Sequence, residues 1–172
     1  QLALSYFKSF DLPLKIVRPF NTYGPRQSSR AIIPSIISQI LNKNSEIKLG
    51  SLTPTRDMTY VTDTCNGFLE IYKSDKLFGE IVNVGSNSEI SISDLVNLIA
   101  RLMKRDIIIR SEETRIRPTN SEVNRLVCDN TKLKSNTNWS CKNTLEQGIH
   151  KVIEWMKKPK NLNMYKTDIY SI

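Results

Sequence analysis

The chain has 172 residues, of which 39% are hydrophobic and 24% charged, and its formal net charge is +8. This length allows one domain, or a large part of one, to bury a core of its own. Since no apolar run approaches the ~18 residues of a membrane helix and no basic, apolar leader opens the sequence, we expect neither a membrane protein nor a secreted one.

Cysteine and histidine usage argues against disulfide and metal chemistry. Cys65, Cys128 and Cys141 lack Cys-x-x-Cys spacing, and their odd number fits reduced thiols in a cytoplasm. His150 is the only histidine, so we expect no zinc site. The composition therefore predicts a cytoplasmic protein without a metal.

The basic charge raises the alternative of nucleic-acid binding, because clustered Lys and Arg side chains release counterions from a phosphate backbone. The basic residues of this chain are mostly scattered. The one dense run, KKPK at 157–160, lacks the interleaved aromatic side chains of a single-strand binder. We interpret this run as a solvated tail, and the arginines beside turns as a sign of a small anionic ligand.

The chain opens with a helical pattern. Leu2, Ala3, Tyr6 and Phe7 recur at helical spacing without a capping residue before them, and Gln1 is no initiator. We therefore expect the sequence to be cut from a longer one. A turn and a short buried strand, with Leu14, Ile16 and Val17, follow.

Helices and short strands alternate along the rest of the chain. Helices are predicted at 35–42 with Pro34 in the first turn, from Thr62 or Asp63 to 75, from Ser91 or Ser93 to 104, from Asp129, and at 144–157. Strands are predicted between them: two within 45–61, one at 80–86 and one at 105–113. This alternation predicts an α/β or α+β domain.

Four polar stretches lie beside the predicted strands: RPFNTYGPRQ (18–27), TPTRDMTYVTD (53–63), VNVGS (82–86) and RIRPTNSEVNR (115–125). Each by itself is explained by turn residues, a surface ion pair or solvated arginines. Ligand sites in open α/β sheets form outside the carboxyl ends of strands, however. Taken together, the stretches predict a cradle of guanidinium and amide groups for an anion such as phosphate.

In this order, RPFNTYGPRQ, RDMTYVTD, VNVGS and RPTNSEVNRLVCDNTKL resemble the carboxyl-terminal half of the extended short-chain dehydrogenase/reductase family, the NAD-dependent nucleotide-sugar epimerases and 4,6-dehydratases. The likeness runs to about Trp155. It is strongest to dehydratases of nucleotide-linked N-acetylglucosamine, in cell-surface polysaccharide biosynthesis. The resemblance implies an α/β fold: the end of a Rossmann-like NAD-binding domain at 1–25, a smaller nucleotide-sugar-binding domain at 26–158 with short returns to the Rossmann sheet, and a peripheral tail at 159–172.

The resemblance also implies roles for individual residues. Pro19 and Thr22 would lie beside the nicotinamide end of NAD. Asn21 and Arg56 would bind the substrate diphosphate, with Asp57 orienting Arg56 or pairing nearby, and Arg117 would be a second diphosphate ligand. The remaining expected contacts with the nucleotide come from Arg30, Lys48, Leu49, Asn83, Asn120 and Glu122.

By the same resemblance, the whole enzyme oxidises the sugar at C4, eliminates water across C5 and C6, and returns hydride to C6. A 4-epimerase of the same family is the alternative, and a non-catalytic module that binds nucleotide-sugar or nucleic acid is another. The catalytic Tyr-x-x-x-Lys is expected upstream of this sequence, and the six glycines never form a dinucleotide-binding turn. We therefore assign no catalytic residue here and expect this chain alone to be inactive. The partners expected are a nucleotide-diphosphate sugar and a second subunit, with no nucleic acid and no membrane. The first helix would form the homodimer contact or pack inward.

Overall fold

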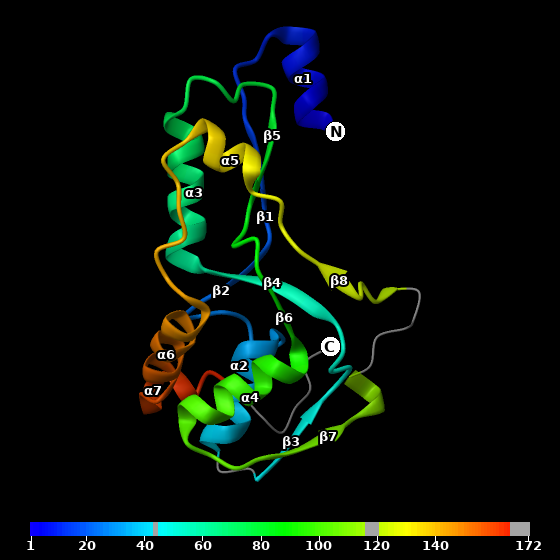
Figure 1. The fold of residues 1–172 in the computed structure, drawn as a ribbon, viewed down its shortest axis with the longest axis vertical. Coiled ribbons are helices and arrows are strands. Elements are labelled where there is room, and N and C mark those ends of the chain that lie inside the picture. The colour runs from blue at the N-terminus through cyan, green and yellow to red at the C-terminus, as the bar shows by residue number, and fades with distance from the viewer. Residues whose placement is uncertain (43–44, 116–120, 166–172) are drawn as a thin grey trace.

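The structure is a computed structural model that describes residues 1–42, 45–115 and 121–165. It is elongated, with two groups of helices and strands at opposite ends and a longer strand between them (Figure 1). The expected α/β architecture with parallel strands is confirmed.

One end is built on a parallel pair of strands, β1 (Ile16–Pro19) and β5 (Ile81–Val84), in which Arg18 lies opposite Asn83. Helices α3 (Val61–Lys73) and α5 (Thr131–Asn136) pack beside this pair, and α1 (Leu2–Phe10) lies at its outer end (Figure 1). The core of this end consists of Ile71, Leu77, Val82, Val84, Leu133 and Trp139.

The other end is mainly helical and holds the larger core. Its helices are α2 (Ile32–Leu41), α4 (Ile92–Met103), α6 (Leu145–Met156) and the short α7 (Pro159–Leu162). Strands β3 (Glu46–Leu49) and β7 (Ile108–Ser111) form a second parallel pair at its edge (Figure 1). The isoleucine-rich faces of α2, α4 and α6 meet here, as their helical spacing requires.

Strand β4 (Thr55–Tyr60) joins the two ends (Figure 1). It pairs in parallel with β2 (Asn21–Tyr23) and β8 (Arg125–Leu126), and antiparallel with β6 (Glu89–Ser91). A 3-10 turn, η1 (Glu113–Arg115), follows β7. The first, second and fourth polar stretches therefore meet in one sheet.

The long predicted elements are confirmed, with shifted ends. The helix expected from residue 35 begins at Ile32, because a proline is tolerated in a first helical turn and Pro34 takes that place. The helix expected after a Thr62 or Asp63 cap begins at Val61. Asp63 is buried instead, and it accepts hydrogen bonds from the backbone N–H groups of Lys142 and Asn143.

Helix α1 was expected to form a dimer contact or to pack inward. None of its residues is fully buried: Leu2 is 73% and Phe10 71% exposed, whereas Phe7 is half-buried and its ring lies against Gly79. Part of the segment expected as a peripheral tail is packed, because Tyr165 is buried and its hydroxyl donates to the carbonyl oxygen of Gln27 at 2.9 Å. In the described part of the chain, no helix is long and apolar enough to cross a membrane.

Candidate functional site

A cavity of about 300 Å³ opens beside β4, between β2, α2 and the turns after β3 and β7. Five of the residues assigned to the substrate line it: Asn21, Arg30, Leu49, Arg56 and Glu122. Its volume is at the lower end of the range for small-molecule sites. The fold thus brings together residues from the first, second and fourth polar stretches.

Strand pairing explains why these side chains share one face. Side chains two apart on a strand point to the same side, so Arg56 and Met58 of β4 both reach the cavity. Asn21 lies opposite Met58 in the parallel β2–β4 register and reaches it as well. Asp57, between Arg56 and Met58, and Thr22, next to Asn21, do not line the cavity.

Two buried polar atoms at the cavity lack a hydrogen-bond partner within the described residues: Asn21 Nδ2 and Gln27 Oε1. Gln27 is anchored, since its Nε2 donates to the carbonyl oxygen of Thr22 at 2.9 Å. That bond leaves Oε1 as the unpaired end of the amide. Buried polar groups are nearly always paired, so these two atoms are exceptions among the described residues.

Arg56 is held by three acceptors. Its Nη1 donates to the carbonyl oxygens of Thr55 at 2.8 Å and Val123 at 2.6 Å, and its Nη2 lies 2.6 Å from Glu122 Oε1. The side chains of Arg56 and Glu122 are only 14% and 18% exposed. A planar guanidinium in this position suits a phosphate.

The far wall of the cavity is formed by Gly50 and Arg115. A Cβ on Gly50 would lie 2.3 Å from the carbonyl oxygen of Arg115, so only glycine allows this approach. Arg115 also pairs with Glu112. The hydrogen bond from Arg115, and to a smaller extent the charge of Lys48, lowers the pKa of the Glu112 carboxyl. Arg30 is exposed at the rim.

Lys48 lies outside the cavity. Its ammonium is 3.6 Å from Glu112, and its backbone N–H and carbonyl both bond with the side chain of Gln39. The neighbouring Leu49 reaches the cavity, while its carbonyl accepts a bond from the N–H of Glu112.

Pro19, Thr22 and Asn83 also lie apart from the cavity. Pro19 is exposed at the end of β1. The hydroxyl of Thr22 faces α3, 3.0 Å from Thr64 Oγ1. Asn83 on β5 donates a long bond of 3.5 Å to the carbonyl of Asp129. The other two assigned residues, Arg117 and Asn120, are outside the described residues.

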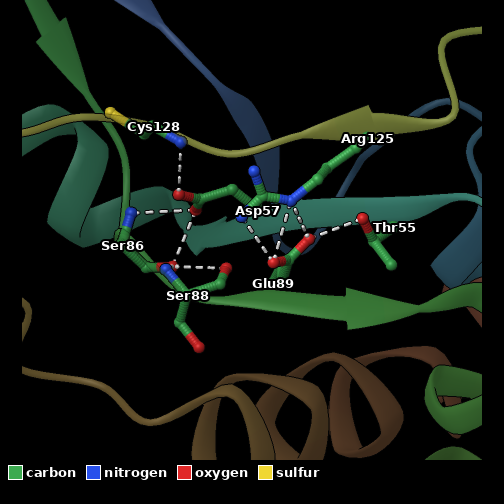
Figure 2. Close-up of polar contacts among 7 residues, drawn as sticks. All are labelled: Thr55, Asp57, Ser86, Ser88, Glu89, Arg125 and Cys128. Carbon is green, nitrogen blue, oxygen red and sulfur yellow. Dashed lines mark hydrogen bonds and ion pairs between the residues drawn. The ribbon is translucent and has the colours of Figure 1, made fainter.

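Of the two roles expected for Asp57, orienting Arg56 or pairing nearby, the contacts of its carboxylate fit the second. Its buried carboxylate accepts bonds from the backbone N–H groups of Ser86 and Cys128 at 2.9 and 3.1 Å, and from the Ser86 hydroxyl at 2.7 Å (Figure 2). The backbone N–H of Asn87 also donates to it, at 2.8 Å. Because adjacent strand residues face opposite sides, Arg56 lines the cavity, whereas Asp57 bonds with the loops after β5 and β8.

Sequence reasoning did not assign Gln27, Gly50 or Arg115 to the site. Gln27 closes the first polar stretch and Arg115 opens the fourth, so their position beside assigned residues was an available signal. No signal in the sequence pointed to Gly50, because its close contact with Arg115 arises only in the tertiary fold.

The cavity lining is dominated by cationic and neutral polar groups. It combines three arginines and one carboxylate, Glu122, with neutral amides, hydroxyls and apolar side chains, and the described lining has no histidine, cysteine, tyrosine or lysine. No cluster of three metal-ligating side chains occurs among the residues that the structure describes. Fold and cavity define an α/β protein with an arginine-lined cavity beside parallel strands.

Comparison with known proteins identifies the family. The model of the GDP-mannose 4,6 dehydratase family matches residues 1–152, and the chain belongs to this family of nucleotide-sugar dehydratases and related epimerases. The dTDP-D-glucose 4,6-dehydratase of Homo sapiens is 32% identical over 159 residues, which are 90% of this chain and 44% of that protein. The family expected from the four polar stretches is confirmed.

Two solved structures share the fold. A dTDP-glucose 4,6-dehydratase from Bacillus anthracis in complex with NAD matches with a TM-score of 0.80 and 28% identity, over 92% of this chain and 49% of that one. A UDP-glucuronic acid 4-epimerase from Bacillus cereus in complex with UDP-glucuronic acid and NAD matches with a TM-score of 0.82 and 26% identity, over 91% and 49%. The chain spans about half the length of these relatives.

Proposed function

We propose that this chain is the carboxyl-terminal, nucleotide-sugar-binding part of an NAD-dependent nucleotide-sugar 4,6-dehydratase. The observation that carries the proposal is the cavity whose lining combines three arginines with Asn21 and Gln27, each of which has an unpaired polar atom. Relatives that span the same fold are a dTDP-glucose 4,6-dehydratase and a UDP-sugar epimerase. The whole enzyme would oxidise the sugar at C4, eliminate water across C5 and C6 and return hydride to C6.

In this proposal the arginines bind the diphosphate. Arg56 faces one phosphate, Asn21 Nδ2 donates to an oxygen of the same group, and Arg30 attracts the nucleotide at the rim. Each charge-assisted hydrogen bond would contribute roughly 1.5 to 3 kcal/mol. Binding energy from this unreactive part of the substrate orients the sugar for chemistry elsewhere.

The other assigned residues complete the proposed site. Leu49 would pass beside the base, with Lys48 next to it on β3. Arg117 would bind the second phosphate. Ribose or base contacts are proposed for Asn83, Asn120 and Glu122.

The described residues hold little of a cofactor site. The two assigned to NAD, Pro19 and Thr22, offer no uncommitted polar side chain, because the Thr22 hydroxyl is bonded to Thr64. NAD, when bound, supplies reversible oxidation of a sugar hydroxyl, and we derive no step through it from this chain. We propose that the residues that hold it, and the catalytic Tyr-x-x-x-Lys, belong to the rest of the enzyme, so that this chain alone does not turn over substrate.

We further propose a cytoplasmic homodimer that forms through α1. Leu2, Tyr6 and Phe10 expose apolar surface on this helix, and the rings of Tyr6 and Phe10 pack together with centroids 5.4 Å apart. Exposed apolar patches of this kind are typical of interaction surfaces.

The alternative within the family is a 4-epimerase, favoured by the likeness to the UDP-glucuronic acid 4-epimerase. Incubating the whole enzyme with UDP-N-acetylglucosamine and dTDP-glucose, followed by mass spectrometry and NMR of the product, separates the two. A 4-keto-6-deoxy product supports the dehydratase. A C4 epimer as the product would instead show that the enzyme is a 4-epimerase. Tight binding of DNA at physiological salt, without binding of UDP or dTDP, would contradict both the dehydratase and the epimerase proposals.

A further inference from the structure

The ion pair of Arg56 and Glu122 lies inside the cavity itself. Nη2 and Oε1 are 2.6 Å apart, both side chains line the cavity, and both are mostly buried. A ligand that reaches this wall therefore meets an Arg56 whose Nη2 is already paired. A buried guanidinium without an anion beside it would be costly, because it would lose its hydration without compensation.

Arg56 does not depend on Glu122 for its position. Its Nη1 is anchored on the carbonyl oxygens of Thr55 and Val123, and the backbone N–H of Thr55 donates to the carbonyl of Asn124 at 2.9 Å. These bonds tie the guanidinium to the β4–β8 pair. The Nη2 group, where Glu122 binds, is the one directed to an anion.

We propose that Glu122 is an internal competitor for the substrate diphosphate: its carboxylate binds Arg56 Nη2 in the free protein and is displaced by a phosphate oxygen when the nucleotide enters. The inference rests on the proposed function, since it needs a diphosphate in this cavity, and it replaces the ribose or base contact proposed for Glu122. The anchored Arg56 keeps its place during the exchange. By competing for Arg56, Glu122 thus lowers the affinity of the cavity for the nucleotide and favours release of the product.

The sign of an affinity change tests this proposal. Removing a competing carboxylate frees Nη2 and removes charge repulsion toward the ligand, whereas removing a ligand contact weakens binding. UDP is titrated into the whole enzyme as wild type, Glu122→Gln and Glu122→Ala, with binding measured by calorimetry. We expect the Kd for UDP to fall about three- to tenfold in both variants, a change of about 0.7 to 1.4 kcal/mol.

Glu80→Gln is the matched control, because it removes the same charge from an exposed pair with Lys132 at the other end of the molecule. Its Kd should equal that of the wild type. A Kd that is unchanged or higher in Glu122→Gln, while wild type binds UDP, overturns the proposal and leaves the proposed function intact. If the wild type binds neither UDP nor dTDP, this proposal and the proposed function are both overturned.

A second readout does not depend on the variants folding well. In a crystal structure of the wild-type enzyme with UDP, we expect a phosphate oxygen within hydrogen-bond distance of Arg56 Nη2 and Glu122 turned away from it. An intact ion pair beside bound UDP would overturn the proposal.

Discussion

Asp57 links three segments of the chain through one buried carboxylate (Figure 2). In Asp57→Asn an amide NH₂ would face N–H donors that now bond with a carboxylate oxygen. Since a hydrogen bond to a charged group contributes roughly 1.5 to 3 kcal/mol, we expect a loss of at least about 2 kcal/mol of unfolding free energy. Urea denaturation followed by circular dichroism measures it.

Glu89→Gln provides the control for this substitution. Glu89 also accepts bonds, from Arg125 and Thr55, and these lower its pKa, but the pair is exposed (Figure 2). Exposed ion pairs contribute about 0 to 1 kcal/mol, so the urea midpoint should barely move. Equal losses in the two variants would contradict the role of Asp57.

Cys128 predicts how stability depends on alkaline pH. Burial, and secondarily the carboxylate of Asp57, raises the pKa of its thiol from 9.0 to about 12. The unfolded chain releases this proton above about pH 9 while the folded chain keeps it. The free energy of unfolding should therefore be highest below pH 9 and fall toward pH 12.

Burial also raises the pKa of Tyr23, which acts in the same direction. Urea midpoints at pH 8 and pH 11 measure the combined fall, and Cys128→Ala should make that fall smaller. A fall of equal size in Cys128→Ala and wild type would show that the thiol does not contribute.

The cavity shows which site residues a sequence can reveal. Asn21, Arg30 and Arg56 were assigned through the resemblance of their sequence segments to a known family, and the structure places them around one cavity. Gln27 was missed because its importance lies in an acceptor left unpaired by a bond to Thr22. For Asp57 the sequence left open whether it orients Arg56 or pairs nearby, and strand alternation, which turns it away from Arg56, favours the second.

Helix α6 begins with reciprocal bonds between Thr144 and Gln147. Thr144 Oγ1 accepts from the N–H of Gln147 at 3.2 Å, and Gln147 Oε1 accepts from the N–H of Thr144 at 3.0 Å. Thr144→Ala should cost about 1 kcal/mol of unfolding free energy. Thr144→Ser keeps the hydroxyl and should stay near wild type in thermal denaturation, and equal losses in both would argue against the cap.

The helices were largely predictable from sequence, whereas the short strands were not. Helices α4 and α6 have apolar stripes of three turns, and their caps Ser91 and Thr144 were among the expected starts. Strands β2, β6 and β8 have two or three residues each and were missed. Their pairing with β4 is set by tertiary contacts, which no local pattern encodes.

At the scale of the molecule, the residues that the structure describes form two hydrophobic cores, one around the β1–β5 pair and one among α2, α4 and α6. These two groups of elements lie at opposite ends of the fold (Figure 1). We propose that they correspond to the end of the NAD-binding domain with its returning segments and to the nucleotide-sugar-binding domain. The cavity lies at the second core. The sequence predicted two units, but only the fold shows that α3, β5 and α5 gather around the first.

A crystal structure of the whole enzyme with UDP-N-acetylglucosamine tests the central claim most directly. We predict that the diphosphate lies in the cavity beside β4, with phosphate oxygens within about 3.2 Å of Asn21 Nδ2 and of the Arg56 guanidinium. A nucleotide bound at another place, with Asn21 and Arg56 untouched, would contradict the account.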